Sequence, residues 1–393
     1  MGFLSKNYQF LFVLILFGSC YTTDKQQLAS DPLPITFDLD AEYKSVHLTG
    51  LIKGVSIVHI DDETVLGNIV KVINHKDLLY FLDRDQMAVN IYKKNGEFVN
   101  KICAAGQAPN EYIQLVDIFI DSVNSTLNLV SRVDKKLFKY TIDGAELIEI
   151  EKLPTYYFNM SKKEDEYFGF LGNHTDSKND NKNLSMLHND LTVKHNFFDV
   201  DKGFENYHDA TVQPFSIYNG QLYYIQPLDY NIYLFDNDGY DIKYRIDFGK
   251  RNWPNGINSL QKIDNMSPTE KTKYVKNVNM FQETSDYLMT LFLYGGQKYL
   301  GLYDKKEGKT EVTILDTYTK DLFFPFGTIV GIDERSIYTM IDATHIKSIL
   351  NGSDGYNNFA EKHPKQIETM RTLFEGLELN DDSNGFLVTY SVL

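Results

Sequence analysis

Cysteine is nearly absent from this chain of 393 residues, which contains only Cys20 and Cys103. A framework of several disulfides is therefore excluded, and the stability of the fold has to come from packing. The sequence also lacks HExxH and H-x-x-x-H spacings, the G-x-S-x-G motif and the P-loop, so it predicts no zinc site, no serine-hydrolase elbow and no phosphate-binding loop. We expect no cofactor and no metal.

Clusters of basic residues are missing as well. The chain has 54 Asp and Glu against 39 Lys and Arg, a formal net charge of −15. Nucleic-acid binding depends on clustered cations that displace counterions from the phosphate backbone, so nucleic acid is excluded as a partner. The stretch Asp236 to Gly239 resembles the start of a calcium loop but lacks a glutamate at the twelfth position, and we interpret it as a solvated turn.

Near the N-terminus, the apolar run is too short to cross a membrane, which takes about 20 residues. This run, Phe10 to Phe17, is preceded by Lys6 and followed by Gly18-Ser19, a pattern typical of a secretory signal. Cys20 comes next, and the residues before it resemble the lipobox of bacterial lipoproteins, although Phe17 stands where leucine is commonest.

We therefore expect a signal peptide over 1–19, a lipid on Cys20 and a tether over 20–35. A signal peptide that is cut before a chance cysteine is the alternative. Cys103 is left without a partner, and no histidine lies near it in sequence. We expect it to be a small buried residue at the end of a strand, not a nucleophile.

Aromatic residues make up 14% of the chain, with 27 Tyr and 26 Phe, and they favour strands. Three segments, 78–102, 126–150 and 221–246, share one pattern: an apolar run, a polar break, a second apolar run, a glycine turn and a third run. The turns are Asn95-Gly96, Asp143-Gly144 and Asp238-Gly239, dipeptides that favour type I′ hairpins.

Six copies of this unit can be placed, with second strands near Leu78, Thr126, Tyr167, Gln221, Asp286 and Arg335. Their spacing of roughly 45 residues is typical of a propeller blade. The sequence thus predicts one all-β domain over 36–393, a six-bladed β-propeller of four-stranded antiparallel blades. Closure of the ring is expected from the C-terminal strand after Gly385, paired with 54–60 as outer strand of the last blade.

Helical insertions are expected near 258–276 and 357–377. In the first, Ser267, Pro268 and Glu270 are the N-cap, first-turn and third positions of a helix. In the second, Ile367, Met370, Leu373 and Phe374 recur at helical spacing.

The segments 45–86, 95–102, 106–112 and 246–256 carry a family likeness. With them the chain resembles the six-bladed β-propeller lipoproteins of Bacteroides and relatives, whose fold is similar to that of NHL-repeat propellers. The resemblance implies a lipoprotein of the bacterial outer membrane, on its periplasmic or its surface face. The family commonly has Gly-Arg-Gly-Pro-Gly-Glu-Tyr where this chain has Gly-Gln-Ala-Pro-Asn-Glu-Tyr at 106–112. Any anion bound by the family's arginine is lost at Gln107, whereas the turn at Pro109 is expected to survive.

In a propeller, the connectors between blades share a face with the links between second and third strands, and that face commonly binds ligands. The candidates on it are Asp83, Arg84, Glu111, Tyr112, Arg132, Asp229, Tyr230 and Trp253. For each of them, a solvated loop residue or a blade-packing contact is the alternative, and for 106–112 we favour a structural connector. The turns at Gly96, Gly144 and Gly239 belong to the opposite face, which we expect to be inert.

Three classes of function remain open. The first is a monomeric, non-catalytic binding module of the cell envelope, whose partner is a glycan, a peptide or a protein. The second is a lyase or hydrolase acting on polysaccharide, which would require a histidine or a pair of acids close to Arg84 or Arg132. The third is a structural component of an envelope complex.

Overall fold

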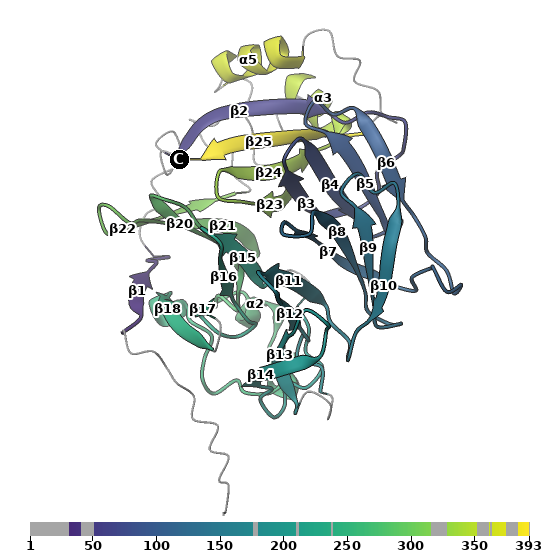
Figure 1. The fold of residues 1–393 in the computed structure, drawn as a ribbon. Helices are drawn as coiled ribbons and strands as arrows, with labels where there is room; N and C mark the ends of the chain where they lie inside the picture. Colours follow the sequence, from purple (N-terminus) through teal and green to yellow (C-terminus); the bar gives the residue numbers. More distant parts are fainter. Residues whose placement is uncertain are drawn as a thin grey trace, which may run out of the picture.

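The chain is folded into six antiparallel sheets arranged around a central axis, as the computed structural model shows (Figure 1). The structure describes residues 31–40, 51–175, 180–209, 212–236, 239–315, 328–351, 361, 364–374 and 384–392. This is the six-bladed propeller with four-stranded blades that the repeat predicts. The second strands of the blades begin within one residue of the positions that the sequence indicates.

Each blade runs from an inner strand at the axis to an outer strand at the rim. Blade 1 holds β3 (Ile69–His75), β4 (Leu78–Asp83), β5 (Ala88–Lys93) and β6 (Phe98–Ile102). Blade 2 holds β7 (Leu115–Asp121), β8 (Thr126–Ser131), β9 (Lys136–Thr141) and β10 (Leu147–Lys152). Blade 3 holds β11 (Asn159–Lys163), β12 (Glu166–Phe170), β13 (Lys182–Leu187) and β14 (Val193–Asp199).

The second half of the ring repeats this order. Blade 4 holds β15 (Phe215–Tyr218), β16 (Gln221–Tyr224), β17 (Asn231–Phe235) and β18 (Tyr240–Asp247). Blade 5 holds β19 (Val278–Glu283), β20 (Tyr287–Tyr294), β21 (Gln297–Asp304) and β22 (Lys309–Ile314). Blade 6 holds β23 (Thr328–Ile332), β24 (Ser336–Ile341), β25 (Phe386–Val392) and, from the other end of the chain, β2 (Ile52–His59).

The hydrophobic core is divided among the interfaces between blades. The buried apolar side chains of the described residues form six clusters, and each cluster joins two neighbouring blades. This explains why β4 has five consecutive buried residues: both of its faces are covered by other sheets. A single blade could not bury both faces alone, so the ring stabilises itself as a unit.

Polar bonds connect the blades at the axis. The buried carboxylate of Asp117 in β7 accepts hydrogen bonds from Lys71 Nζ of β3 at 2.8 Å and from the Met160 backbone N–H of β11 at 2.9 Å. The Gln213 side chain, just before β15, donates to the Val70 carbonyl of β3 at 3.4 Å. Blade 4 is thereby tied to blade 1 on the far side of the ring.

Ring closure follows the prediction. Strand β25 pairs with β24 on one side and with the N-terminal β2 on the other, with Ile57 opposite Val388. Asn384, just before β25, fastens the connector that leads from β2 to blade 1. Its Oδ1 accepts from the Leu66 N–H at 2.8 Å, and its Nδ2 donates to the carbonyls of Asp61 at 2.8 Å and Thr64 at 2.7 Å.

A fifth strand on blade 4 was not expected from the sequence. Strand β1 (Leu33–Thr36) begins within the predicted tether and pairs in parallel with the outer strand β18. The residues that follow it continue along the groove between blades 4 and 5, where Phe37 and Leu39 are buried and Asp40 pairs with Arg251 at 2.6 Å. We call residues 33–40 the N-terminal strap.

The predicted type I′ turns are wrong in detail. Gly96 and Gly144 have φ of +88° and +70°, but Asn95 and Asp143 do not have positive φ. Each hairpin instead has a turn with one left-handed glycine, closed by a bond from the glycine N–H to the carbonyl three residues earlier. Gly239 has no positive φ, and Asp238 lies outside the described residues. The flanking strands are antiparallel, as expected.

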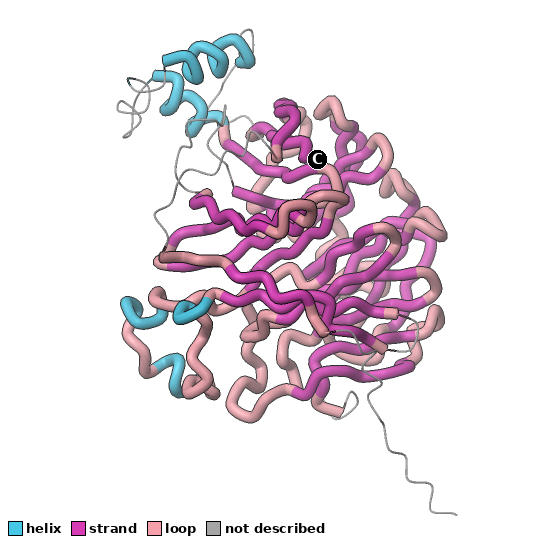
Figure 2. Tube along the Cα trace, turned by 90° about the vertical axis from the view of Figure 1, so that its left-hand side faces the viewer, coloured by secondary structure: helices cyan, strands magenta, loops and turns pink. Residues whose placement is uncertain are grey.

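All described helices lie on one face of the propeller (Figure 2). Helices α1 (Leu260–Asp264) and α2 (Pro268–Lys271) belong to the connector between blades 4 and 5. Helices α3 (Ala343–Asn351) and α5 (Pro364–Phe374) lie between β24 and β25. The capping box of Ser267 and Glu270 is present in α2. We call this side of the ring the helical face; within the part of the chain described, no helix is long and apolar enough to span a membrane.

Candidate functional site

The helical face carries all eight predicted ligand-binding residues, because every connector between blades and every link between second and third strands emerges there. Their environments differ strongly, however. Six of them hold the turns and connectors in place, and the alternative of a scaffold contact applies to these six. Cys20, the predicted lipidation site, lies outside the described residues.

Asp83 belongs to the scaffold. It is fully buried at the end of β4, where its Oδ2 accepts from the Gly67 N–H at 2.6 Å and its Oδ1 from the Gln86 N–H at 3.1 Å. The carboxylate thus fixes the turn after β4 to the connector that precedes blade 1. Because it is fully buried, this carboxylate is not accessible to a ligand.

The loop 106–112 is a structural connector, which is the interpretation that the sequence favours. Glu111 Oε2 accepts from the Ala108 N–H at 2.8 Å, and the Glu111 N–H donates to the Ala108 carbonyl at 2.9 Å, so the turn at Pro109 is formed. Tyr112 is fully buried between blades 1 and 2, and its hydroxyl donates to the Met87 carbonyl at 2.7 Å. Burial is also the main reason why the pKa of Tyr112 is raised.

One correction concerns a neighbour of this loop. Cys103 is exposed, not buried, because β6 ends at Ile102 and the chain leaves the blade at the rim of the helical face.

Asp229, Tyr230 and Trp253 fix the connector between blades 4 and 5. Asp229 accepts from the Asn231 N–H at 2.9 Å and from the Tyr233 hydroxyl. The Tyr230 hydroxyl accepts from the Trp253 N–H at 2.5 Å. The indole N–H of Trp253 donates to the Ile257 carbonyl at 3.3 Å, within its own connector. Trp253 is half-buried and anchors this loop.

Arg132 has a different environment. Its guanidinium lies over the ring of Phe158, 3.7 Å from the centroid. The imidazole of His208 stacks on the same ring, with centroids 3.6 Å apart and an angle of 23° between the planes. Two groups this close to one ring must lie on its opposite faces, so Phe158 is sandwiched between a cation and a histidine. The three residues come from the turn after β8, the connector before β11 and the connector before β15.

The charges around this stack are unbalanced. Burial lowers the pKa of Arg132, and the described residues contain no carboxylate in ion-pair distance of it. Its Nε is buried and has no hydrogen-bond partner among them. Arg84 is exposed on the turn after β4, where its N–H donates to the Asn68 carbonyl and its own carbonyl accepts from the Met87 N–H; its side chain has no hydrogen bond or ion pair with another described residue. A guanidinium presents five donors in a planar fork that matches a carboxylate or another oxyanion.

His208 is neutral at physiological pH. Burial lowers its pKa to about 4, with the charges of Arg132 and then Arg84 acting in the same direction and Asp209 against them. Its Nδ1 is buried without a hydrogen-bond partner in the described part of the chain. The positive charges of both arginines thus disfavour protonation of this imidazole. We call Arg84, Arg132, Phe158 and His208 the arginine cluster.

A second stack flanks the arginine cluster. Lys135 Nζ lies 4.0 Å from the centroid of the Tyr156 ring, and His174 contacts the same ring edge-on, with centroids 5.2 Å apart. On the other side, Lys276 Nζ lies 4.4 Å from the centroid of the Tyr207 ring. Burial lowers the pKa of Lys276, although nearby Asp209 opposes this. The helical face thus adds further cations around the arginines.

A pocket of about 570 Å³ opens at the seam between blades 6 and 1. Its walls come from the connector before β3, from strands β23 and β24, and from the start of β25. The lining residues are Val65, Leu66, Gly67, Asn68, Ile69, Thr328, Val330, Met340, Ile341, Asp342, Asn384 and Gly385. Its volume is in the range of ligand pockets, about 300 to 1,000 Å³.

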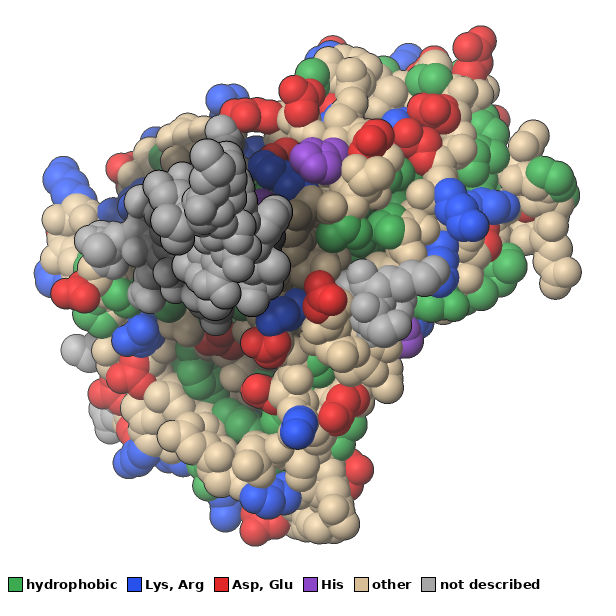
Figure 3. All heavy atoms as spheres, turned by 60° about the horizontal axis from the view of Figure 1, so that its bottom comes forward, with side chains coloured by type: hydrophobic (Ala, Val, Ile, Leu, Met, Phe, Trp, Pro, Cys, Tyr) green, Lys and Arg blue, Asp and Glu red, His purple; other side chains and the backbone are tan. Residues whose placement is uncertain are grey.

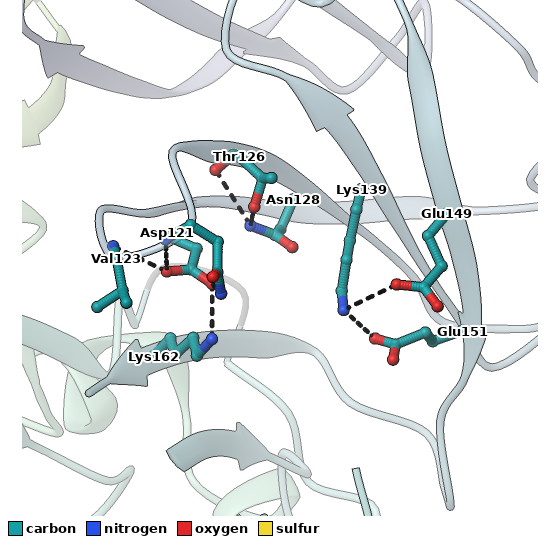
Figure 4. A network of polar contacts seen from close by, with 9 residues as sticks. Asp121, Val123, Thr126, Asn128, Lys139, Glu149, Glu151 and Lys162 are labelled. Carbon is teal, nitrogen blue, oxygen red and sulfur yellow. Dashed lines mark hydrogen bonds and ion pairs between the residues drawn. The ribbon is translucent and has the colours of Figure 1, made fainter. Parts of the chain in front are cut away.

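The opposite face is built from short turns and ion pairs that hold blades together. Asp121, at the end of β7, pairs with Lys162 of β11 at 2.6 Å, and both side chains are only 2% exposed (Figure 4). Lys139 pairs with Glu149 and Glu151 of the neighbouring strand β10, within blade 2 (Figure 4). Figure 3 shows another side of the molecule, the one that is lowest in Figure 1, where acidic and basic side chains are interspersed.

Sequence reasoning missed Phe158 and His208. Both lie in connectors without periodic pattern, and they are 50 residues apart in the chain, so only the ring topology brings them together. The signal that could have found them is position: each precedes or lies near an inner strand on the face that carries Arg84 and Arg132. Among the described residues, no group of three or more His, Cys, Asp or Glu side chains is placed to hold a metal ion.

A solved protein structure has a fold similar to that of this chain. A Bacteroides fragilis protein described as exported has a similar structure, with a TM-score of 0.69 and 18% identity over 92% of this chain and 100% of that one. A member of the DUF4221 family from Bacteroides vulgatus has a TM-score of 0.48 and 10% identity over 87% of this chain and 97% of its own. Among curated proteins, none matches the chain in sequence. One family model matches residues 34–391, and the chain therefore belongs to the family described as Domain of unknown function (DUF4934).

Proposed function

We propose that this protein is an exported binding module of the bacterial envelope, held to the outer membrane by a lipid on Cys20, and that it binds its ligand at the arginine cluster. The ligand is a glycan, a peptide or a protein segment that carries an anionic group. The observation that carries the proposal is Arg132: a partly buried guanidinium, fixed against Phe158 and without a carboxylate partner among the described residues.

The stack prepares Arg132 for binding. Its contact with the Phe158 ring holds the guanidinium plane in one orientation, so less side-chain entropy is lost when a ligand binds. Neutral His208 adds an uncharged ring behind Phe158 and does not compete for the anion. Arg84 supplies a second positive charge from the neighbouring blade. A ligand oxyanion would replace the missing carboxylate partner.

An array of acidic and neutral glycans and peptides, probed with the purified protein, tests the proposal. We expect acidic members to bind and Arg132→Gln to weaken them by about tenfold or more, because hydrogen bonds to charged groups contribute about 1.5 to 3 kcal/mol. Arg335→Gln is the matched control, since Arg335 is an exposed arginine on the opposite face. Binding that is equal for Arg132→Gln and wild type would place the ligand elsewhere.

A second candidate is an enzyme that cleaves an acidic polysaccharide by elimination. The observation that favours it is His208, a neutral imidazole beside Arg84 and Arg132, which is the convergence that the enzyme hypothesis requires. The imidazole would take the proton from the carbon next to the sugar carboxylate, and an arginine would stabilise the charge that develops on that carboxylate. The double bond would form as the neighbouring glycosidic C–O bond breaks, and the leaving sugar oxygen would take up a proton from water. The low pKa of His208 makes it a weak base, which is why binding is the leading proposal.

Incubation with polygalacturonate distinguishes the two. Elimination produces a conjugated double bond that absorbs in the ultraviolet, and His208→Ala would abolish this signal. A binding module gives no product with either protein.

A further inference from the structure

Two stacks of the same composition share one turn and one connector of the helical face. In each, a cation of the turn after β8 lies over an aromatic ring of the connector before β11, and a histidine contacts the same ring. The members of the first stack are Arg132, Phe158 and His208, and those of the second are Lys135, Tyr156 and His174. We call them the paired stacks. The same arrangement therefore occurs twice, at neighbouring positions of one turn.

The spacing of the paired stacks follows from the connector that carries their rings. Tyr157 is fully buried, so Tyr156 and Phe158 project from the other side of the chain. Alternate residues of an extended chain lie about 7 Å apart. The cations lie 3.7 and 4.0 Å from the centroids of their rings, and the Leu153 N–H donates to the Lys135 carbonyl at 2.8 Å, which fixes the turn against the connector. The two positive charges are therefore neighbours, at a spacing comparable to that of the rings.

The histidines brace both rings from loops that are bonded to each other. His174 follows β12, and His208 lies in the connector before β15. The Asn206 N–H donates to the Asn173 carbonyl at 2.6 Å, and Asn206 Oδ1 lies 2.9 Å from Nδ1 of His174. The rings are thus held between a turn on one side and a pair of loops on the other. Because this framework already orients the cations, less side-chain entropy is lost when a ligand binds them.

Both cations of the paired stacks are available to a ligand. Within the described ranges, neither the Arg132 guanidinium nor the Lys135 ammonium has a hydrogen bond or an ion pair, and both side chains are partly exposed. Asp134 lies between them in sequence, but its side chain is 10% exposed and lies 3.4 Å from Lys136 Nζ. The carboxylate of this turn is therefore directed to Lys136 and does not neutralise the two stacked cations.

Exposed apolar side chains beside the paired stacks favour a peptide over a glycan. Val133, on the turn of the two cations, is 48% exposed, and Ile113, in the connector before β7, is 43% exposed. The Arg132 N–H donates to the Gln114 carbonyl at 3.0 Å, so the turn and this connector are joined beside Ile113. Apolar side chains of a peptide can cover such residues, whereas glycan hydroxyls placed against them would lose hydrogen bonds to water.

We propose that the paired stacks bind an extended acidic peptide segment, in which one carboxylate binds Arg132 and the carboxylate two residues away binds Lys135. Alternate side chains of an extended chain point to the same side and recur about every 7 Å, which matches the alternate positions of Tyr156 and Phe158. Arg132 offers a planar fork to the first carboxylate, and Lys135 offers a point charge to the second. This inference rests on the proposed function and reduces its three ligand classes to one.

Two repeat peptides of equal composition and equal charge test the spacing. The first alternates Glu and Ser, so that every carboxylate has another two residues away. The second repeats Glu-Glu-Ser-Ser, in which no two glutamates are two residues apart. In titration calorimetry, we expect the alternating peptide to bind about tenfold more tightly, because only this peptide can place carboxylates on both cations at once. Added salt should weaken the binding, since it screens the charges.

Variants of the two cations test which groups bind. We expect Arg132→Gln and Lys135→Gln each to weaken the alternating peptide by about tenfold and to remove its advantage over the second peptide. The matched controls are Arg335→Gln and Lys94→Gln, which change exposed cations in turns of the opposite face and should alter neither affinity. Thermal melts show whether each variant is folded, and Lys135→Gln keeps the test valid if Arg132→Gln is not. The proposal is overturned if the alternating peptide binds Lys135→Gln as tightly as wild type, or binds wild type no more tightly than the second peptide does.

The outcome for the proposed function is separate. If acidic members of the array depend on Arg132 but Lys135→Gln changes nothing, the anion site at Arg132 stands and the paired site is refuted. If polygalacturonate binds as tightly as the alternating peptide and depends on both cations, the peptide class is refuted while binding at Arg132 stands. If no acidic ligand depends on Arg132, both the inference and the proposed function fail.

Discussion

Replacing Asp121 with alanine should destabilise the propeller more than any surface change, because Asp121 neutralises a buried lysine. Its carboxylate accepts from Lys162 Nζ at 2.6 Å, from the Asn124 side chain at 2.8 Å, and from the N–H groups of Val123 and Asn124 at 3.0 and 3.1 Å (Figure 4). Although burial opposes it, the hydrogen bonds from Lys162 and Asn124 lower the pKa of Asp121. Without this carboxylate, the Lys162 ammonium is 2% exposed and retains the Tyr167 ring, 4.6 Å away.

The expected loss of stability depends on which partner of the ion pair is removed. Removing one partner of a buried ion pair leaves an uncompensated charge and costs about 3 to 5 kcal/mol. The reverse change, Lys162→Met, leaves the carboxylate with three donors from its own turn and should cost less, about 1 to 2 kcal/mol. The double variant should be closer in stability to Lys162→Met than to Asp121→Ala, because it has no unpaired ammonium.

Urea unfolding, followed by the fluorescence of Trp253, the sole tryptophan, measures these differences. Lys93→Met is the surface control: its pair with Glu97 is about half exposed, and such pairs contribute about 0 to 1 kcal/mol. The reasoning is refuted if Asp121→Ala is no more destabilising than Lys162→Met, or if the double variant is the least stable of the three.

Three further predictions concern other parts of the molecule. The free energy of unfolding should fall as the pH drops from 6.5 toward 4. The pKa of His208 is about 4 in the folded protein against 6.5 ordinarily, so the unfolded chain takes up the proton first. In urea titrations at each pH, His208→Phe should flatten this decline. Gly96→Ala should lower the free energy of unfolding by more than about 2 kcal/mol, because the new Cβ would lie 1.9 Å from the His59 carbonyl oxygen at a φ of +88°. Gly239→Ala meets open space and should leave the free energy of unfolding unchanged in the same assay. Cys20→Ala should release the protein from membranes on fractionation, and unchanged retention would exclude the lipid anchor.

The blades could be predicted from the sequence because each repeats a local pattern. Strands such as β4, the second of blade 1, and β17, the third of blade 4, are continuous apolar runs next to turn residues, and the interval between equivalent strands is set by the size of a blade. The N-terminal strap could not be found in this way. Strand β1 has four residues, includes a proline, and pairs with a partner about 200 residues away, so no local periodicity marks it.

The sequence predicts only which face of the ring carries the candidate site. Topology indicates which connectors meet, and this places Arg84 and Arg132 correctly on the helical face. Topology does not show which carboxylates are engaged by the backbone. Asp83 and Asp229 accept hydrogen bonds from backbone N–H groups of nearby turns and connectors. The turn type of Asn95-Gly96 was missed for a similar reason, since the same dipeptide fits both a type I′ turn and a turn with a single left-handed glycine.

The N-terminal strap has a mechanical consequence. Any pull on the N-terminus reaches the strap before it reaches β2, the strand that closes the ring. The strap resists through its pairing with β18, through the buried rings of Phe37 and its neighbours Phe248 and Phe292, and through the ion pair of Asp40 with Arg251. Tension that reaches the strap from the N-terminal side is therefore borne at blades 4 and 5, and not at the seam between blades 6 and 1. The propeller can be held by its end without load on the one blade that is assembled from both ends of the chain.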